Sequence, residues 1–282
     1  MWHWPRVVRH LPPERGQRHR RRSLHPVTTS CAPSPILFYH GLPGAPSDRT
    51  LLSTTAPTEA VDWLAALDTD APFETAICAQ FERLTQDRDP VHLIGFSLGA
   101  MAVLTLATRH PTRVSRVTLI SPAGPWADGA FADQMAGASV FRAARRSRTR
   151  LTLLAVAQMT WLRFAPDLFL RTVFKSAHST ERALIAMPAL RIHIVGGYAR
   201  MFSTHLHAYV RALRHYACAW TPTTLPAHIP VALIQGTKDT WTPPDMARDL
   251  AARLGPQTHI TWIDDAGHYG ALTALTDGPM PA

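Results

Sequence analysis

The sequence predicts an α/β fold in which a mostly parallel sheet is flanked by helices. Short apolar runs rich in β-branched residues recur along the chain, and polar or glycine-containing loops follow them directly. An alanine-rich helical pattern at residues 100–109 begins right after one of these loops. Nearly continuous apolar strands that alternate with helices are typical of parallel sheets buried on both faces.

The strands of this sheet are expected at the apolar runs, because β-branched and aromatic residues favour extended backbone. These runs are Ile36–Tyr39, 91–94, Val114–Ile120, 231–235 and Thr258–Ile263. Residues 45–58 are rich in Pro, Ser and Thr, and we expect only a weak strand at 50–54. Helices are expected next at 58–67 and 73–85.

About a hundred residues separate the third run from the fourth, and they lack the alternation of strands. Residues 125–225 therefore form a predicted helical insertion between two halves of a core, residues 35–124 and 226–282. A chain of 282 residues is long enough for one such core and one insertion. The helical patterns lie at 151–164, 167–174, 179–187 and 198–216, punctuated by Pro166, Pro188 and the Gly196-Gly197 pair.

The most informative stretch is Gly95-Phe96-Ser97-Leu98-Gly99, which lies where the second predicted strand turns into a helix. A serine on such a turn adopts a strained backbone, so its neighbours two positions away must be small. The turn lifts the hydroxyl group clear of the sheet, and the helix that follows points its N–H groups at developing negative charge. Ser97 is therefore the predicted nucleophile, with Gly95 and Gly99 as supporting residues.

A serine nucleophile needs a base to take its proton and an acid to orient that base. His268 and Asp239 each follow a predicted apolar strand closely, at the edge where open parallel sheets gather their ligands. They are the predicted base and acid. Asp264 and Asp265 are rivals for the acid, but they lie too close to His268 along the chain to be favoured and are expected to brace its loop.

A further motif, His40-Gly41-Leu42-Pro43-Gly44, follows the first predicted strand directly. The predicted nucleophile, acid and base also follow one another along the chain in that order. With this loop, the G-x-S-x-G turn and that order, the sequence resembles the α/β-hydrolase superfamily. The resemblance covers roughly residues 35–124 and 226–270.

The resemblance implies that the backbone N–H groups of Leu42 and Leu98 form an oxyanion hole. His40 and Gly41 then belong to the supporting loop, and His40 is expected to be structural rather than a second base. It also implies that residues 125–225 are a helical cap above the nucleophile.

In function, the resemblance implies a serine hydrolase that cleaves a carboxylic ester or related acyl bond and needs no metal or organic cofactor. The nearly all-apolar run at 151–162 favours a mainly apolar small-molecule substrate. The alternatives that remain open are a C–C bond hydrolase, a thioesterase, an amidase or an acyltransferase with the same three residues. A non-catalytic binding protein with this fold is a further alternative.

The formal net charge is +9, and most of it lies in residues 1–34, which hold seven arginines and one glutamate. We expect this basic arm to be disordered, with a transit peptide as one alternative and nucleic-acid binding as another. No specific nucleic-acid partner is expected. The arginine cluster at 142–150 is expected to be a solvated face, and contact with a membrane surface or an anionic ligand is the alternative.

The cysteines, Cys31, Cys78 and Cys218, are odd in number and lack paired spacing, so neither a disulfide framework nor a zinc site is predicted. The fifteen histidines show no spacing typical of a metal site. No apolar stretch reaches the roughly 18 to 20 residues that span a bilayer. We expect a cytoplasmic protein, and the sequence leaves its oligomeric state open.

Overall fold

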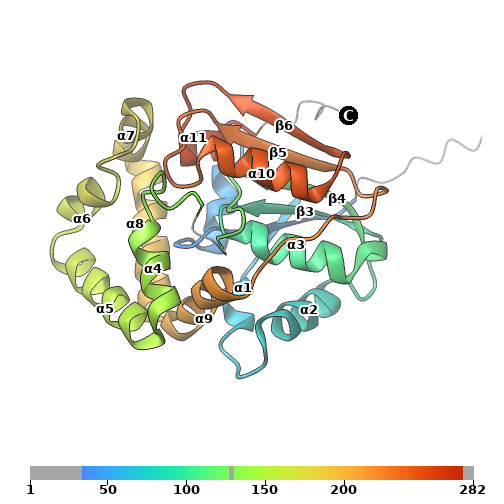
Figure 1. The fold of residues 1–282 in the computed structure, drawn as a ribbon, viewed down its shortest axis with the longest axis horizontal. Coiled ribbons are helices and arrows are strands. Elements are labelled where there is room, and N and C mark those ends of the chain that lie inside the picture. Colours follow the sequence, from blue (N-terminus) through green and yellow to red (C-terminus); the bar gives the residue numbers. More distant parts are fainter. Residues whose placement is uncertain (1–33, 127–129, 276–282) are drawn as a thin grey trace, which may run out of the picture. The chain divides into compact units, whose positions relative to one another are not determined.

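In the described residues the sheet has six strands in the order β2-β1-β3-β4-β5-β6, and every neighbouring pair is parallel (Figure 1). This arrangement comes from a computed structural model that describes residues 34–126 and 130–275. The predicted parallel sheet flanked by helices is confirmed. The expected disorder of the basic arm concerns residues that, apart from Ser34, lie outside those described.

All five strands expected from the apolar runs are present, and one edge strand is added to them. In chain order the strands are β1 (Ile36–Tyr39), β2 (Thr58–Val61), β3 (Val91–Phe96), β4 (Val114–Ile120), β5 (Val231–Gly236) and β6 (Thr258–Ile263). Strand β5 is buried throughout, and β3 is buried except at His92. Such continuous burial is the reason that these strands read as unbroken apolar runs.

Helices α3 and α10 cover the central and the later strands, respectively. Helix α3 contacts β1, β3 and β4, and α10 contacts β5 and β6. Small buried residues such as Ala100 and Ala102 let α3 pack closely on the sheet. Outside the insertion the helices are α1 (Trp63–Ala66), α2 (Phe73–Leu84), α3 (Gly99–Arg109), α10 (Pro244–Leu254) and α11 (His268–Thr273), with 3-10 turns η1 (Pro46–Leu51) and η2 (Pro111–Arg113).

The register of the sheet brings the carboxyl ends of its strands to one edge. Tyr39 of β1 lies beside Gly95 of β3, and Phe96 of β3 lies beside Ile120 of β4. The loops that follow these strands therefore start from the same edge, where residues distant in sequence can meet.

Between β4 and β5, residues 138–218 form a helical insertion that lies on the left in Figure 1. Helix α4 packs on α5 and α9, and α5 also packs on α8. The helices predicted at 151–164, 167–174 and 179–187 are confirmed with small shifts at their ends. The insertion consists of α4 (Ala138–Arg146), α5 (Arg148–Phe164), α6 (Pro166–Val173), α7 (Ser179–Ala186), α8 (Pro188–Ser203) and α9 (Leu206–Cys218).

The predicted weak strand at 50–54 is wrong. The chain instead forms the 3-10 turn η1, in which Pro46 occupies the first turn. The Asp48 carboxylate accepts a hydrogen bond from the Ala45 N–H at 3.1 Å and closes that turn. Proline and this local side-chain bond favour a turn over an extended strand.

The predicted helix at 58–67 is also largely wrong, because Thr58–Val61 is the edge strand β2 and only Trp63–Ala66 is helical. Strand β2 pairs with β1 along its whole length. The Asp62 carboxylate then accepts a hydrogen bond from Ala65 N at 3.4 Å and starts α1. Pairing with an existing strand overrode the weak helical preference of this short segment.

The single helix predicted at 198–216 is two helices, α8 and α9, which meet at Thr204 and His205. The Gly196-Gly197 pair lies inside α8 and does not interrupt it. A Cβ on Gly197 would come within 2.9 Å of the Gly44 Cα, so this glycine lets α8 approach the loop after β1. Close packing, rather than a turn, accounts for the glycine at that position.

The arginine cluster at 142–150 spans the end of α4 and the start of α5. Between them, Ser147 accepts a hydrogen bond from Arg150 N at 3.0 Å and caps α5. Within the described ranges, no helix is both long and apolar enough to cross a membrane.

Candidate active site

Ser97 lies on the turn between β3 and α3, and its φ of 53° is in the left-handed region. A Cβ on Gly99 would come within 2.2 Å of the Tyr39 carbonyl oxygen, and one on Gly95 within 3.0 Å of Ala100. Neither position has room for a side chain. The sharp turn between strand and helix thus depends on these two glycines.

Backbone hydrogen bonds hold this strained turn in place. Ser97 N donates to the Ile120 carbonyl at 2.9 Å, which ties the turn to the end of β4. The Ser97 carbonyl accepts from the N–H groups of Ala100 and Ala123, both at 3.1 Å. Strain of this kind persists only where its surroundings fix it, and it is common at functional sites.

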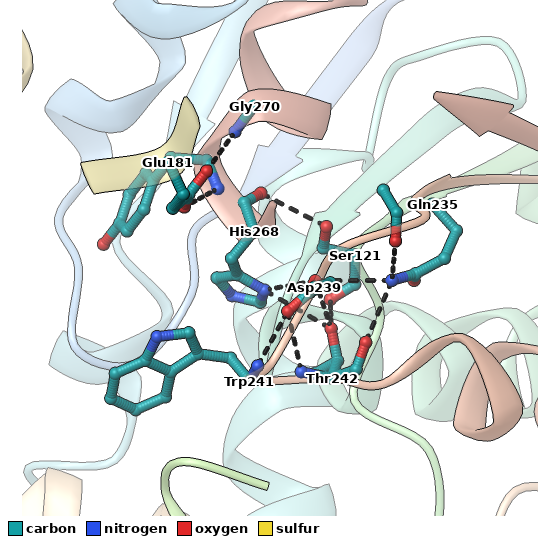
Figure 2. Close-up of polar contacts among 10 residues, drawn as sticks. Ser121, Glu181, Gln235, Asp239, Trp241, Thr242, His268 and Gly270 are labelled. Carbon is teal, nitrogen blue, oxygen red and sulfur yellow. Dashed lines mark hydrogen bonds and ion pairs between the residues drawn. The ribbon is translucent and has the colours of Figure 1, made fainter. Parts of the chain in front are cut away.

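The Asp239 carboxylate is buried in the loop after β5 and is surrounded by donors (Figure 2). Its Oδ1 accepts from the backbone N–H groups of Trp241 at 2.8 Å and Thr242 at 3.0 Å. Its Oδ2 lies 2.8 Å from the Thr242 hydroxyl and 3.3 Å from Gln235 Nε2. The last partner of Oδ2 is His268 Nδ1, also at 2.8 Å.

These partners decide the charge of Asp239. Burial alone would raise its pKa, but the adjacent His268 ring and the hydrogen bonds from His268 and Thr242 outweigh burial and hold that pKa below its usual value. Asp239 is therefore a carboxylate at neutral pH. An ionised carboxylate only accepts hydrogen bonds, so His268 Nδ1 carries the proton between them and Nε2 is the free nitrogen.

His268 begins α11, and contacts with the β4 and β5 loops fix its position. The Ser121 hydroxyl donates to the His268 carbonyl at 3.2 Å. The ring packs against Phe96 and Trp241, with centroids 4.9 and 6.4 Å away. His268 and Ser97 line one small cavity, and no hydrogen bond joins their side chains in this structure. Such contacts are often long in an unliganded site and tighten when substrate binds.

His40, in the loop after β1, is fully buried and serves as a structural anchor. Its Nδ1 lies 2.8 Å from the Gly41 carbonyl, and its own carbonyl accepts from Trp63 Nε1 at 3.0 Å. Burial lowers the pKa of His40 to about 4 and outweighs the opposing effect of the Gly41 bond. The ring is neutral at physiological pH.

The loop that His40 anchors brings Leu42 to the same cavity as Ser97 and Leu98. The backbone N–H groups of Leu42 and Leu98 donate no hydrogen bond to any described residue. The two residues predicted to form the oxyanion hole thus line the same cavity as Ser97.

A cavity of about 290 Å³ opens above Ser97, and both the core and the helical insertion line it. Its walls are mainly apolar and aromatic, and the insertion supplies most of them. They include Met135, Phe141, Trp161, Phe169, Tyr198 and Leu213.

Glu181 is a residue of this site for which no sequence pattern suggested a role. It lies on α7 of the insertion, is 2% exposed, and accepts hydrogen bonds from Tyr269 N at 2.7 Å and Gly270 N at 3.2 Å (Figure 2). Burial raises the pKa of Glu181, while those two bonds and the nearby His268 ring act in the opposite direction. Through these two hydrogen bonds the insertion contacts the first turn of α11, the helix that carries His268.

The rival acids lie elsewhere. Neither the Asp264 nor the Asp265 carboxylate forms an ion pair or a hydrogen bond with a described residue. The Asp265 backbone braces the loop instead, because its N–H donates to Thr237 Oγ1 at 3.0 Å and its carbonyl accepts from Thr180 Oγ1 at 2.6 Å. No cluster of three or more potential metal ligands occurs in residues 34–126 and 130–275.

Residues 34–275 match the family model described as the alpha/beta hydrolase fold. The chain belongs to the α/β-hydrolase family. The match spans both halves of the core and the insertion between them. The resemblance expected from the sequence motifs is therefore confirmed.

Solved structures of other α/β-hydrolases share the fold at low sequence identity. A putative lipase from Acinetobacter baumannii AYE is 16% identical with a TM-score of 0.58, and the match covers 88% of this chain and 81% of that one. An esterase from Thermogutta terrifontis is 18% identical with a TM-score of 0.53, over 85% of this chain and 84% of that one.

Among curated proteins, monoacylglycerol lipase abhd6-B of Xenopus laevis is 39% identical over 56 residues. This match spans only 17% of this chain and 17% of that relative. The family match and the solved structures thus agree on the α/β-hydrolase fold.

Proposed function

We propose that this α/β-hydrolase is a serine esterase that cleaves a carboxylic ester of a mainly apolar small molecule. The observation that carries the proposal is the buried Asp239–His268 pair, which shares the edge of the sheet with Ser97 on its strained turn. Nucleophile, base and acid on three separate loops match the arrangement that acyl transfer requires.

In the proposed mechanism, His268 Nε2 accepts the hydroxyl proton of Ser97 while the Ser97 oxygen attacks the ester carbonyl. The N–H groups of Leu42 and Leu98 stabilise the oxyanion, and each such donor is worth roughly 3 to 4 kcal/mol. Collapse of the tetrahedral intermediate breaks the ester bond, and His268 returns the proton to the leaving alcohol. Asp239 holds the ring in the required tautomer and stabilises its positive charge.

Water completes the cycle. It attacks the acyl-serine while His268 takes its proton, and a second collapse releases the carboxylic acid and restores the Ser97 hydroxyl. The helical insertion acts as a cap in this scheme, because its apolar walls exclude bulk water and hold the apolar part of the substrate.

The experiment that tests the proposal is labelling of the full chain with a fluorophosphonate probe, together with turnover of p-nitrophenyl esters of graded chain length. The native protein should be labelled and should hydrolyse the esters, and Ser97→Ala should do neither. Ser176→Ala is the matched control, since Ser176 lines the same cavity away from the strained turn.

Labelling that persists in Ser97→Ala would disprove the assigned nucleophile. Labelling without ester turnover would instead favour one of the other acyl reactions or a binding role. Thioester and amide substrates in the same assay would then identify the bond.

A further inference from the structure

The large apolar side chains that are exposed in residues 34–126 and 130–275 all lie in the helical insertion. The core with its sheet exposes none of them in those ranges. Scattered exposed apolar residues are normal, so their confinement to one segment calls for an explanation. They are Leu153, Val156, Trp161 and Phe164 on α5, Leu168 on α6, Met187 between α7 and α8, and Ile192 on α8.

On α5 these side chains form a stripe along the outer side of the helix. Because successive helical residues turn by about 100°, Leu153, Val156 and Phe164 fall within about 80° of one another around the axis. The buried residues Leu151 and Leu162 fall on the opposite side, against the rest of the insertion. Phe164 is 82% exposed, so its ring is almost entirely in solvent. Helix α5 thus exposes three large apolar side chains on one side, together with Thr149 and Thr160.

Positive charge concentrates in the same part of the chain. Residues 138–203 hold eleven Lys and Arg against two Asp and Glu, whereas the rest of residues 35–282 holds eleven against seventeen. Several of these cations are exposed and form no ion pair with another described residue. They are Arg146, Arg148, Arg150, Arg163 and Arg171.

Helices α6, α7 and α8 enclose a second cavity, of about 330 Å³, that combines both features. Arg191 in this cavity forms an ion pair with Asp167, whereas Arg171 forms no ion pair with a described residue. Leu168, which is exposed, lies on the same helix α6 as Asp167 and Arg171. Guanidinium groups bind phosphate oxygens in pairs and are weakly hydrated. The cavity is lined by Arg171, Arg182 and Arg191 together with Leu170, Phe174 and Ile185.

We propose that the outer face of the helical insertion, formed by α5 to α8, docks on an anionic phospholipid surface. The apolar side chains would enter the boundary between headgroups and acyl chains, and the arginines would contact lipid phosphates. A nucleic acid would engage the arginines but leave Phe164 and Leu153 in water. A second copy of this chain would oppose the same excess of positive charge. An anionic bilayer is complementary to both the charge and the apolar surface.

Docking has a consequence that rests on the proposed function. Trp161 is 37% exposed and also lines the cavity above Ser97, as does the exposed Lys175. The outer face and the Ser97 cavity therefore meet at the end of α5. A docked insertion holds the proposed esterase site at the lipid surface, where apolar esters accumulate.

The test is co-sedimentation of the full chain with vesicles of phosphatidylcholine alone or of phosphatidylcholine mixed with phosphatidylglycerol. The native protein should bind the mixed vesicles more tightly, and added salt should weaken binding. Phe164→Ser combined with Leu168→Ser should reduce binding roughly tenfold or more. Arg150→Gln combined with Arg171→Gln should reduce it roughly thirtyfold, since each cation near an anionic surface contributes to partitioning.

The control for charge is Arg83→Gln combined with Arg116→Gln, two cations of the core that should leave binding unchanged. Every variant keeps residues 1–33, so the seven arginines there contribute equally throughout. Equal binding by all variants would overturn the proposal and assign vesicle binding to those residues. Absence of binding to mixed vesicles, or a dimer that the apolar variant dissociates, would also overturn it.

The docking proposal and the proposed function can fail separately. Phe164→Ser with Leu168→Ser should hydrolyse a water-soluble ester such as p-nitrophenyl acetate at the native rate. Ser97→Ala should bind vesicles like the native chain. Loss of vesicle binding in Ser97→Ala would show that the surface assignment is wrong.

Discussion

At the scale of single residues, the site depends on a few buried polar groups that hold one another. Asp239 stays ionised in a buried loop because donors from its own loop and from His268 surround it. Glu181 has a related role across the boundary between insertion and core, where it accepts from the first turn of α11. We infer that it is a positioning residue for the proposed base.

Glu181→Gln should lower turnover of esters about tenfold and shift the acidic limb of the pH–rate profile to lower pH. Loss of the carboxylate removes a negative charge that favours the charged ring of His268, and an amide accepts less strongly from Tyr269 N and Gly270 N. The measurement is kcat as a function of pH. Glu82→Gln on α2 is the control, with an unchanged profile. A lower rate with an unmoved profile would indicate a purely structural role.

Candidate site residues with a local signal could be proposed from the sequence, and those without one could not. Gly95, Ser97 and Gly99 could be selected because strand, turn and helix follow one another within a few positions. Glu181 could not, since its partners are 88 and 89 positions away and nothing near it in the chain suggests burial. A lone glutamate in an amphipathic helix is ordinarily exposed.

At the scale of elements, the contact between α8 and the loop after β1 links the insertion to the proposed oxyanion site. Gly197 lies against Gly44, in the same short loop as Leu42. Gly196, its neighbour, has open space around it. The pair therefore provides a matched comparison between a packed and a free position on one helix.

Gly197→Ala should reduce kcat for esters about tenfold or more, because its Cβ would push the loop and misplace the Leu42 N–H. Gly196→Ala should keep full activity and stabilise the protein by about 0.5 to 1 kcal/mol, as expected for a glycine replaced in an exposed helix. Steady-state kinetics and chemical denaturation measure the two effects. Equal activity of both variants would contradict the proposed role of this contact.

Helices and strands were predicted well where an apolar run marks them, and poorly where pairing with another strand determines them. Strands β1, β3, β4 and β5 are largely buried apolar runs, so composition alone predicts them. Strand β6 at the other edge was also predicted from an apolar run, although none of its residues is fully buried. Edge strand β2 has the sequence TEAV and becomes a strand only through pairing with β1. Long-range pairing of this kind leaves little trace in a single sequence.

At the scale of the whole molecule, the sheet contains a titratable group whose charge affects folding. His92 on β3 lies 2.8 Å from the Thr118 hydroxyl on β4. Burial, followed by the positive charge of Arg116, lowers the pKa of His92 to about 4. The unfolded chain then binds a proton near pH 6.5 that the folded chain does not bind until the pH is lower.

The free energy of unfolding should therefore fall as the pH decreases from about 6.5 to about 4, relative to a His92→Gln variant. The folded pKa is the lower one, so the contribution of His92 is complete above pH 6.5 and is lost on acidification. Its total is at most roughly 3 kcal/mol. Urea denaturation of both proteins across this pH range measures the difference in their free energies of unfolding. Burial raises the pKa of Asp48 to about 7, and its titration has the opposite effect on stability. Because Asp48 is present in both proteins, its contribution cancels in the difference. Parallel stability curves would contradict the expectation.

The bonds from Glu181 to α11 also constrain how a substrate can reach Ser97. If the α7 end of the insertion moved outward, the Glu181 carboxylate would move with it. Helix α11, which carries His268, would then lose these two hydrogen bonds. Opening at that end would therefore displace His268, the proposed base, just when the substrate enters. We expect substrate to enter and product to leave at the other end of the insertion, beside Trp161. Helix α7 would then keep its hydrogen bonds to α11 throughout.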